Sequence, residues 1–194
     1  MRRILTVALS FAFLCGLTAQ AARAQAPDTK AAPSGFKAEA IRSLEDAEKK
    51  IIALAEAMPA EKYSWKPEGA RSVGEVYMHI AMGNYFQAKM LGVPLPDGVT
   101  SDSLGKITGK GEIVDALKKS YTHVHAAILG VSDLDKQTKL YGREGAMREA
   151  VLIIVSHNHE HLGQCIAYAR MNGVVPPWTA ERQKSQQPAK KSGS

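Results

Sequence analysis

Apolar residues recur at spacings of three and four along four stretches of this chain, which is the pattern of amphipathic helices. The first predicted helix runs from Phe36 to Met58, carries charged residues on its other face and ends before Pro59. Its apolar positions are Ile41, Leu44, Ala47, Ile51, Ile52, Leu54 and Ala55. No stretch alternates apolar and polar residues in the way that would predict a strand. The pattern therefore predicts an all-α protein.

Local signals mark where the predicted helices begin and end. The four helices are expected at residues 36–58, 72–91, 112–129 and 144–171. Ser72 and Glu75 have the capping-box spacing, in which each side chain accepts a hydrogen bond from the backbone N–H of the other residue. Asn172-Gly173 supplies a left-handed cap for the fourth helix, and Pro176-Pro177 prevents its continuation.

Four helices of this length predict a four-helix bundle with long connecting loops. The connections at 59–71 and 94–110 are longer than the usual bundle loop, and loops of that kind often shape a site at one end of a bundle. We expect the bundle domain to cover residues 36–178, after a flexible linker at 25–35 and before a disordered basic tail at 179–194.

The first 24 residues have the layout of a cleavable secretory signal. Two arginines precede an uncharged apolar run from Ile4 to Ala19, and Ala22-Arg23-Ala24 supplies the small residues of a cleavage site. This run is shorter than the roughly 20 residues of a permanent transmembrane helix. We therefore expect cleavage after Ala24, no permanent membrane span, and a mature protein that is periplasmic or secreted.

Loss of this signal would change the charge balance of the chain. Three arginines leave with it, so the net charge falls from +6 to +3 (22 minus 19) over 170 residues (194 minus 24). Four of the remaining cations lie in the tail beside one glutamate, so the folded part is close to neutral and no nucleic-acid partner is expected. Cys165 is then the only cysteine, and its apolar helical surroundings predict a buried residue without an internal disulfide.

Two histidines on the fourth predicted helix are spaced to share one metal ion. His157 and His161 are four residues apart and project from one face of the helix, one turn apart. Two histidines in this geometry bind one zinc-class ion in helical sites generally. His159 points roughly 180° from their mean direction, so we expect it to face solvent or another neighbour.

A third nitrogen ligand could come from His79, His123 or His125. The last two are two residues apart on the third predicted helix and lie among polar residues, which favours packing or solvent-facing roles. His79 lies in the middle of the second predicted helix, where a lone histidine is ordinarily a hydrogen-bonded core residue. From spacing alone, both interpretations of His79 stay open.

Two motifs of this chain resemble the DinB family. They are Arg71-Ser72-Val73-Gly74-Glu75-Val76 with His79-Ile80-Ala81 and Asn84-Tyr85, and His157-x-x-x-His161-x-Gly163-Gln164 with Tyr168-x-Arg170-Met171-Asn172-Gly173-x-x-Pro176-Pro177. The resemblance extends from about Phe36 to Trp178. It implies a four-helix bundle in which one histidine of the second helix joins the pair on the last helix to bind a divalent metal. By motif position the ligands are His79, His157 and His161.

The resemblance implies a metal-dependent hydrolase or thiol S-transferase that acts on a small molecule and holds one divalent metal ion, zinc or nickel. Leu162 stands where many relatives have arginine. Three imidazoles leave one coordination position open, as in catalytic zinc sites. Gln164, one turn beyond His161, is expected to orient a ligand or a histidine N–H, or else to bond the backbone in the core.

The alternative hypothesis is a non-catalytic envelope module that binds a ligand or holds a structural metal. A structural metal requires a fourth protein ligand, and two carboxylates lie near enough in sequence to be considered. Glu75 already has a capping role, and Glu160 points about 80° from the mean ligand direction. Glu160 also completes the His-x-x-Glu-His pattern of inverted zinc proteases, but the one later carboxylate side chain is Glu181 in the tail. The sequence leaves a homodimer open.

Overall fold

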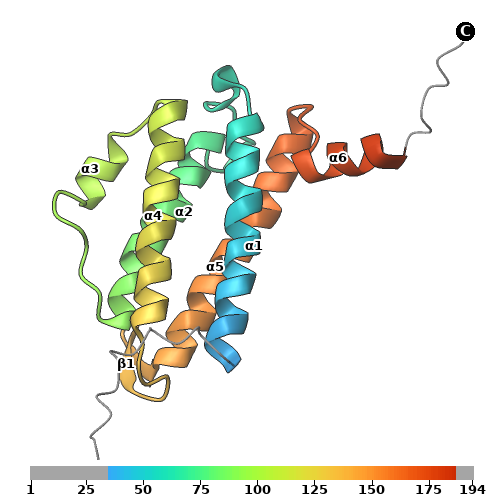
Figure 1. Ribbon diagram of the computed structural model, residues 1–194. Helices are drawn as coiled ribbons and strands as arrows, with labels where there is room; N and C mark the ends of the chain where they lie inside the picture. The colour runs from blue at the N-terminus through green and yellow to red at the C-terminus, as the bar shows by residue number, and fades with distance from the viewer. Residues whose placement is uncertain (1–34, 187–194) are drawn as a thin grey trace, which may run out of the picture. The chain divides into compact units, whose positions relative to one another are not determined.

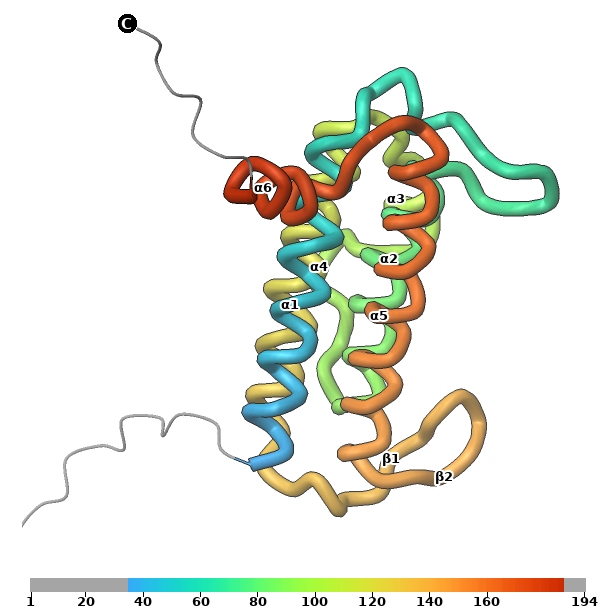
Figure 2. Tube along the Cα trace, turned by 90° about the vertical axis from the view of Figure 1, so that its right-hand side faces the viewer, coloured from blue at the N-terminus to red at the C-terminus, as the bar shows by residue number. Residues whose placement is uncertain are grey.

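In the computed structural model, which describes residues 35–186, four long helices form a bundle (Figure 1). They are α1 (Gly35–Ala57), α2 (Val73–Ala88), α4 (Lys110–Gly130) and α5 (Met147–Met171). α1 and α2 each pack against both α4 and α5, so α1 and α2 lie diagonally opposite each other. α1 and α5 run in one direction, and α2 and α4 run in the other (Figures 1 and 2). The predicted all-α bundle is confirmed.

The predicted signal segment and the linker up to residue 34 lie outside the described residues, as does the end of the tail from residue 187. Within residues 35–186, no helix combines the length and the apolar character that a membrane span requires.

The helix signals in the sequence correspond to bonds in the structure. Ser72 N donates to Glu75 Oε2 at 2.6 Å and Glu75 N donates to Ser72 Oγ at 3.3 Å, so the predicted capping box opens α2. Gly173 has a positive φ of 74° just after α5, as the predicted left-handed cap requires. The apolar positions predicted for the first helix are buried, with Ile52 partly so.

Two lysines tie the ends of the antiparallel pair α1 and α4 to each other. Lys37 Nζ, near the start of α1, donates to the carbonyl oxygen of Val131 at 2.7 Å, just after α4. Lys110 Nζ, at the start of α4, donates to the carbonyl oxygen of Met58 at 2.7 Å, just after α1. Each lysine therefore satisfies a carbonyl group at a helix C-terminus, where the helix dipole also favours a positive charge.

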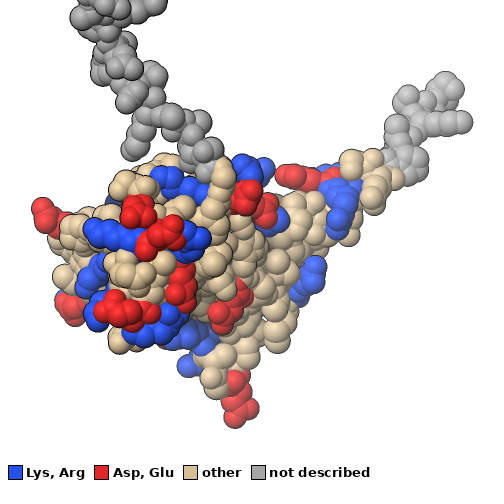
Figure 3. Space-filling model, turned by 90° about the horizontal axis from the view of Figure 1, so that it is seen from below, with Lys and Arg blue, Asp and Glu red and all other residues tan. Residues whose placement is uncertain are grey.

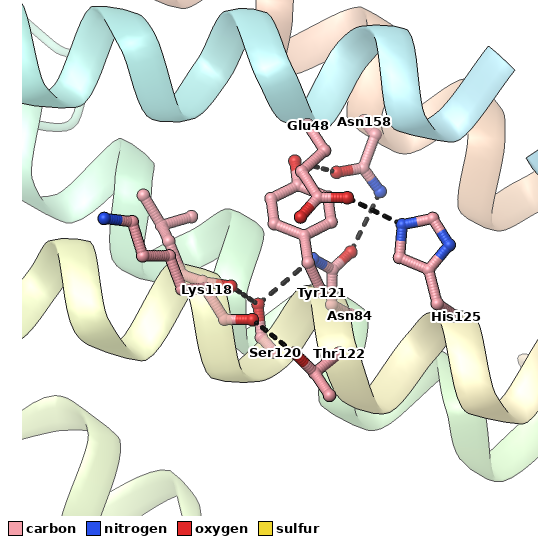
Figure 4. Close-up of polar contacts among 9 residues, drawn as sticks. Glu48, Asn84, Lys118, Ser120, Tyr121, Thr122, His125 and Asn158 are labelled. Atoms are coloured by element: carbon pink, nitrogen blue, oxygen red, sulfur yellow. Dashed lines mark hydrogen bonds and ion pairs between the residues drawn. The ribbon is translucent and has the colours of Figure 1, made fainter. Parts of the chain in front are cut away.

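A chain of buried hydrogen bonds crosses the interior between α2, α4 and α5 (Figure 4). Tyr121 Oη donates to Asn158 Oδ1 at 2.7 Å, and Asn158 Nδ2 donates to Asn84 Oδ1 at 2.9 Å. Asn84 Nδ2 donates to Ser120 Oγ at 3.1 Å, and Ser120 Oγ donates to the Leu117 carbonyl at 2.8 Å. These side chains are fully buried, so each bond replaces one that water would otherwise supply.

The two long connections contain short helical elements. The first contains η1 (Ala60–Lys62). The second starts with η2 (Lys89–Leu91), contains the short helix α3 (Ser101–Gly105) and returns along the outside of the bundle to the start of α4 (Figure 1). Because α2 and α4 run in the same direction, this connection has to cover the whole length of the bundle.

A β-hairpin precedes α5, where the sequence predicted no strand and a helix from about residue 144. β1 (Gln137–Leu140) pairs with β2 (Arg143–Ala146), and α5 begins only at Met147. The two-residue turn has positive φ at Tyr141 (49°) and Gly142 (91°), as a type I′ turn requires. Fully buried Leu140 anchors the hairpin in the core, and Thr138 Oγ1 donates to the Met90 carbonyl at 2.6 Å.

Acidic and basic side chains alternate on the surface at the hairpin end of the bundle (Figure 3). Part of this mixture comes from ion pairs that fix the hairpin. They join Lys139 to Glu144, Arg143 to Glu149, and Arg148 to Asp135. The surface at this end of the molecule therefore has no large patch of uniformly positive or uniformly negative charge.

Part of the tail is ordered as well, which corrects the prediction of disorder from residue 179. α6 (Pro177–Gln186) starts at Pro177, contacts α1 and projects from the opposite end of the bundle to the hairpin (Figure 2). Proline has a fixed φ suited to the first position of a helix, so the same residues that end α5 also begin α6. Trp178 packs against the core and holds the start of this helix in place.

We predict that Tyr121→Phe lowers the free energy of unfolding by about 1–3 kcal/mol, because it leaves buried Asn158 Oδ1 without a donor. Thr122→Val is the matched control, since the exposed Thr122 hydroxyl bonds only to the Lys118 carbonyl of its own helix. That variant should change stability by less than about 0.5 kcal/mol. Denaturant unfolding of both variants measures the difference, and equal losses would contradict a role for the network.

Candidate metal centre

Two neighbouring helices bring three histidines together in the wall of the bundle. His79 comes from α2, and His157 and His161 come from successive turns of α5. One ring nitrogen of each lies within 4.8 Å of those of the other two. The ring centroids are 4.6 Å apart for His157 and His161, 4.7 Å for His79 and His161, and 5.2 Å for His79 and His157.

The spacing of these nitrogens suits a tetrahedral metal ion. His79 Nε2 and His157 Nε2 are 3.3 Å apart. Zinc–nitrogen bonds of about 2.0–2.1 Å at tetrahedral angles separate two ligand nitrogens by about 3.3 Å. The three histidines are therefore positioned to hold a metal ion.

A chain of hydrogen bonds orients His161. Its Nδ1 lies 2.9 Å from Gln164 Oε1, which can only accept, so Nδ1 carries the proton and the Nε2 lone pair of the neutral ring stays free. Gln164 Nε2 donates to Tyr168 Oη at 3.1 Å, and Tyr168 Oη donates to the Arg71 carbonyl at 3.1 Å. Gln164 thus contacts a histidine ring nitrogen and a tyrosine hydroxyl.

His157 is held by packing. Its buried Nδ1 has no hydrogen-bond partner among residues 35–186. Its ring lies against Gly83 of α2, where an added Cβ would be 3.0 Å from Nδ1 and closer still to Cε1. Only glycine leaves room for the ring at this point. Helical spacing places Gly83 one turn beyond His79 on the same face, but it does not predict the contact with His157. An isolated glycine within a helical pattern is itself a signal of close packing.

The electrostatic environment keeps two of the rings unprotonated. Burial, and then the neighbouring His161 and His79, lower the pKa of His157 to about 4. Burial, followed by Arg71 and His161, lowers the pKa of His79, although Glu160 acts in the opposite direction. Near neutral pH these two imidazoles are therefore in the form that binds a metal.

The other histidines lie elsewhere, as the sequence predicted. His159 Nε2 is 3.0 Å from Ser43 Oγ on α1, and His125 Nε2 is 2.7 Å from Glu48 Oε2 (Figure 4). His123 packs against a tyrosine ring of α2. None of the three takes part in the cluster of His79, His157 and His161.

Neither carboxylate near the centre belongs to the cluster. The carboxylate of Glu75 accepts from Ser72 N, and this bond lowers its pKa. Glu160 is exposed on α5. Within residues 35–186, no fourth histidine, cysteine, aspartate or glutamate joins the three rings.

A cavity of about 740 Å³ opens beside His79. Its walls come from α2, from residues 60–64 of the first connection and from residues 104–108 of the second, so both long loops line it as expected. Arg71 contributes the one guanidinium group of its lining. Leu162 is buried in the core.

A sequence model of the DinB superfamily matches residues 43–165. The chain belongs to the DinB superfamily. The matched range includes all three histidines of the centre, the whole of α2, and α5 as far as Cys165. A comparison with the curated proteins finds no match.

Solved DinB-like proteins have the same fold. A DinB-like protein from Bacillus cereus is 18% identical to this chain, with a TM-score of 0.63 over 71% of this chain and 93% of the other. A DinB-like protein from Bacillus subtilis is also 18% identical, with a TM-score of 0.57 over the same shares. At this identity the likeness concerns the fold alone.

We predict that Gly83→Ala weakens metal binding about 10-fold or more, because the added methyl group displaces the His157 ring and its Nε2. Gly163→Ala is the matched control, since a Cβ there meets nothing within 4 Å. That variant should leave metal affinity unchanged and stabilise α5 by up to about 1 kcal/mol. Competition with a chelator measures both affinities, and equal affinities would contradict the role assigned to Gly83.

We also predict that Gln164→Leu weakens metal binding by about 10–100-fold, because His161 Nδ1–H loses its acceptor. Gln164→Glu keeps an acceptor oxygen at the same place and should retain the affinity of the native protein. The same chelator competition compares the two variants. Loss of affinity in both would show that shape, and not the hydrogen bond, is what matters at this position.

Proposed function

We propose that this DinB-superfamily chain binds one divalent metal ion, zinc or nickel, through His79, His157 and His161. We further propose that it is a metal-dependent hydrolase of a small anionic substrate. The observation that carries the proposal is the combination of three imidazoles, with no fourth protein ligand from residues 35–186, and a cavity that reaches one of them.

The ligand set supports a catalytic centre over a structural one. Structural zinc sites are closed by four protein ligands, whereas catalytic sites keep a position for water or substrate. When bound, the metal would supply a Lewis-acidic centre at that position. Gln164 and Gly83 would hold two of the ligands in fixed orientations, which is the contribution that a protein makes to such a site.

The cavity supports a small anionic substrate. Its volume of about 740 Å³ is within the range of small-molecule sites. Arg71 lies near enough to His79 to lower the pKa of that ring, so its guanidinium group can bind a carboxylate or phosphate close to the three histidines. Arg71 would supply the positive charge that an arginine in place of Leu162 would otherwise provide.

We propose that the protein acts in the periplasm or outside the cell. The support is the secretory signal pattern of residues 1–24, with Gln25 as the first mature residue. Low-molecular-weight thiols are scarcer outside the cytoplasm, so this location favours hydrolysis over thiol transfer.

The test begins with metal content. We expect one divalent ion per chain in the native protein and none in the alanine variants of His79, His157 and His161. The alanine variants of His123, His125 and His159 are the controls and should keep the ion. Azide added to the cobalt-substituted protein should then shift its visible spectrum, because one position is open to a small anion.

Two results would overturn the proposal. Retention of metal by His157→Ala together with loss in His159→Ala would exclude the assigned ligand set. A cobalt spectrum that does not respond to azide would indicate a closed shell, and Glu75→Ala or Glu160→Ala would then identify the fourth ligand by opening it. In that case the metal is structural and the chain is a binding module.

A further inference from the structure

A second hollow, of about 430 Å³, lies on the side of His157 that faces the hairpin. α5 lines it from Glu149 to Glu160, Gln87 lines it from α2, and Tyr141 lines it from the hairpin turn. No lysine or arginine belongs to its lining. This differs from the cavity beside His79, which has Arg71 in its wall.

One of the residues that line this hollow has a buried acceptor without a donor. The Gln87 side chain is only 4% exposed, and its Nε2 donates to Tyr141 Oη at 2.9 Å. Gln87 Oε1 is buried and has no hydrogen-bond partner among residues 35–186. Buried polar atoms in native proteins are nearly always paired, so this oxygen points to a hydrogen-bond donor from outside residues 35–186, such as a bound ligand.

The Tyr141 side chain depends on an unfavourable backbone conformation. Among the described residues, Tyr141 is the only non-glycine residue with a positive φ. Asparagine or glycine would suit this turn position better. Tyrosine there places a hydroxyl group beside Gln87, and because that hydroxyl accepts from Nε2, its own proton stays available for a ligand.

The charge of the lining is negative, and one wall is apolar. Glu149 is paired with Arg143, whereas Glu160 forms no ion pair with any residue of the range 35–186. Leu152, which is 52% exposed, and the partly buried Ile153 form the apolar wall. A ligand that matches these features carries a positive charge with N–H donors on a short hydrocarbon chain.

We propose that this hollow binds a primary ammonium group on a short apolar chain, with one N–H donated to Gln87 Oε1 and the charge near Glu160. The binding itself does not require a metal. A role of this hollow in selecting substrates of the metal centre that carry an ammonium group in addition to their anionic group rests on the proposed function.

The test uses butylammonium as the probe and the full chain without metal, so that it is independent of the cobalt experiment. In ¹⁵N-resolved NMR spectra, butylammonium should cause saturable shifts at the Gln87 side-chain amide and the Tyr141 backbone amide. 1-Butanol, which has the same chain without the charge, should bind at least about ten times more weakly. Equal affinity of the two probes, or no shift at Gln87, would overturn the proposal.

Variants separate the two contacts. Gln87→Leu keeps a buried side chain of similar size and should weaken butylammonium binding about five-fold or more, because the acceptor is lost. Glu160→Gln should weaken it about three-fold, with a smaller loss at high salt. Glu45→Gln, on the exposed face of α1, is the control and should have no effect. If Gln87→Leu and Glu160→Gln both bind like the native chain, the hollow is not an ammonium site.

The two proposals can fail separately. If butylammonium binds but the cobalt centre does not respond to azide, the ammonium site is supported and the hydrolase proposal is rejected. If the cobalt centre responds to azide but butylammonium does not bind, the proposed metal site is supported and the ammonium site is rejected.

Discussion

The packing of α2 against α5 is the contact on which the site depends. Two consecutive residues of α2 meet two consecutive residues of α5: Gly83 lies against the His157 ring, and Asn84 bonds to Asn158. The first contact requires close approach and the second requires one axial alignment. A displacement of α5 by one helical turn, about 5.4 Å, would break both contacts and carry its two histidines away from His79. The polar network therefore fixes the alignment that the metal ligands need.

The centre uses two different ways to hold a histidine. His161 is oriented by hydrogen bonds that reach through Gln164 and Tyr168 to the backbone at the start of α2. His157 has no such chain and is confined by the shape of the helix opposite. The first arrangement selects one tautomer of the ring, and the second restricts its position. Together they keep two ligands of one ion in place from a single helix.

Much of the fold could be predicted from the sequence, because helix period, the Ser72 cap and the Gly173 cap are local signals. The convergence of His157 and His161 also followed from spacing alone. His79 could be added only through the resemblance to the DinB family, since its distance from the other two depends on how α2 packs. The Gly83 contact and the Asn84–Asn158 bond join residues more than 70 positions apart, so no local pattern reveals them.

The two missed elements had weak or misleading local signals. The strands of the hairpin are four residues long, with Leu140 as their one fully buried side chain, and the turn has Tyr-Gly in place of the usual Asn-Gly. Pro176-Pro177 predicts the end of α5, although Pro177 also suits the first position of a helix. In both cases tertiary contacts, at Leu140 and Trp178, decide a structure that the local sequence leaves open.

Both hollows beside the histidines take walls from connecting segments, whereas the histidines themselves stand on helices fixed by the core. Loops tolerate insertion and substitution far better than packed helices do. An evolving or engineered descendant of this chain could therefore exchange the segments around residues 60–64, 104–108 and 141 and acquire a different ligand preference. The inherited core would go on supplying the same three imidazoles at the same spacing.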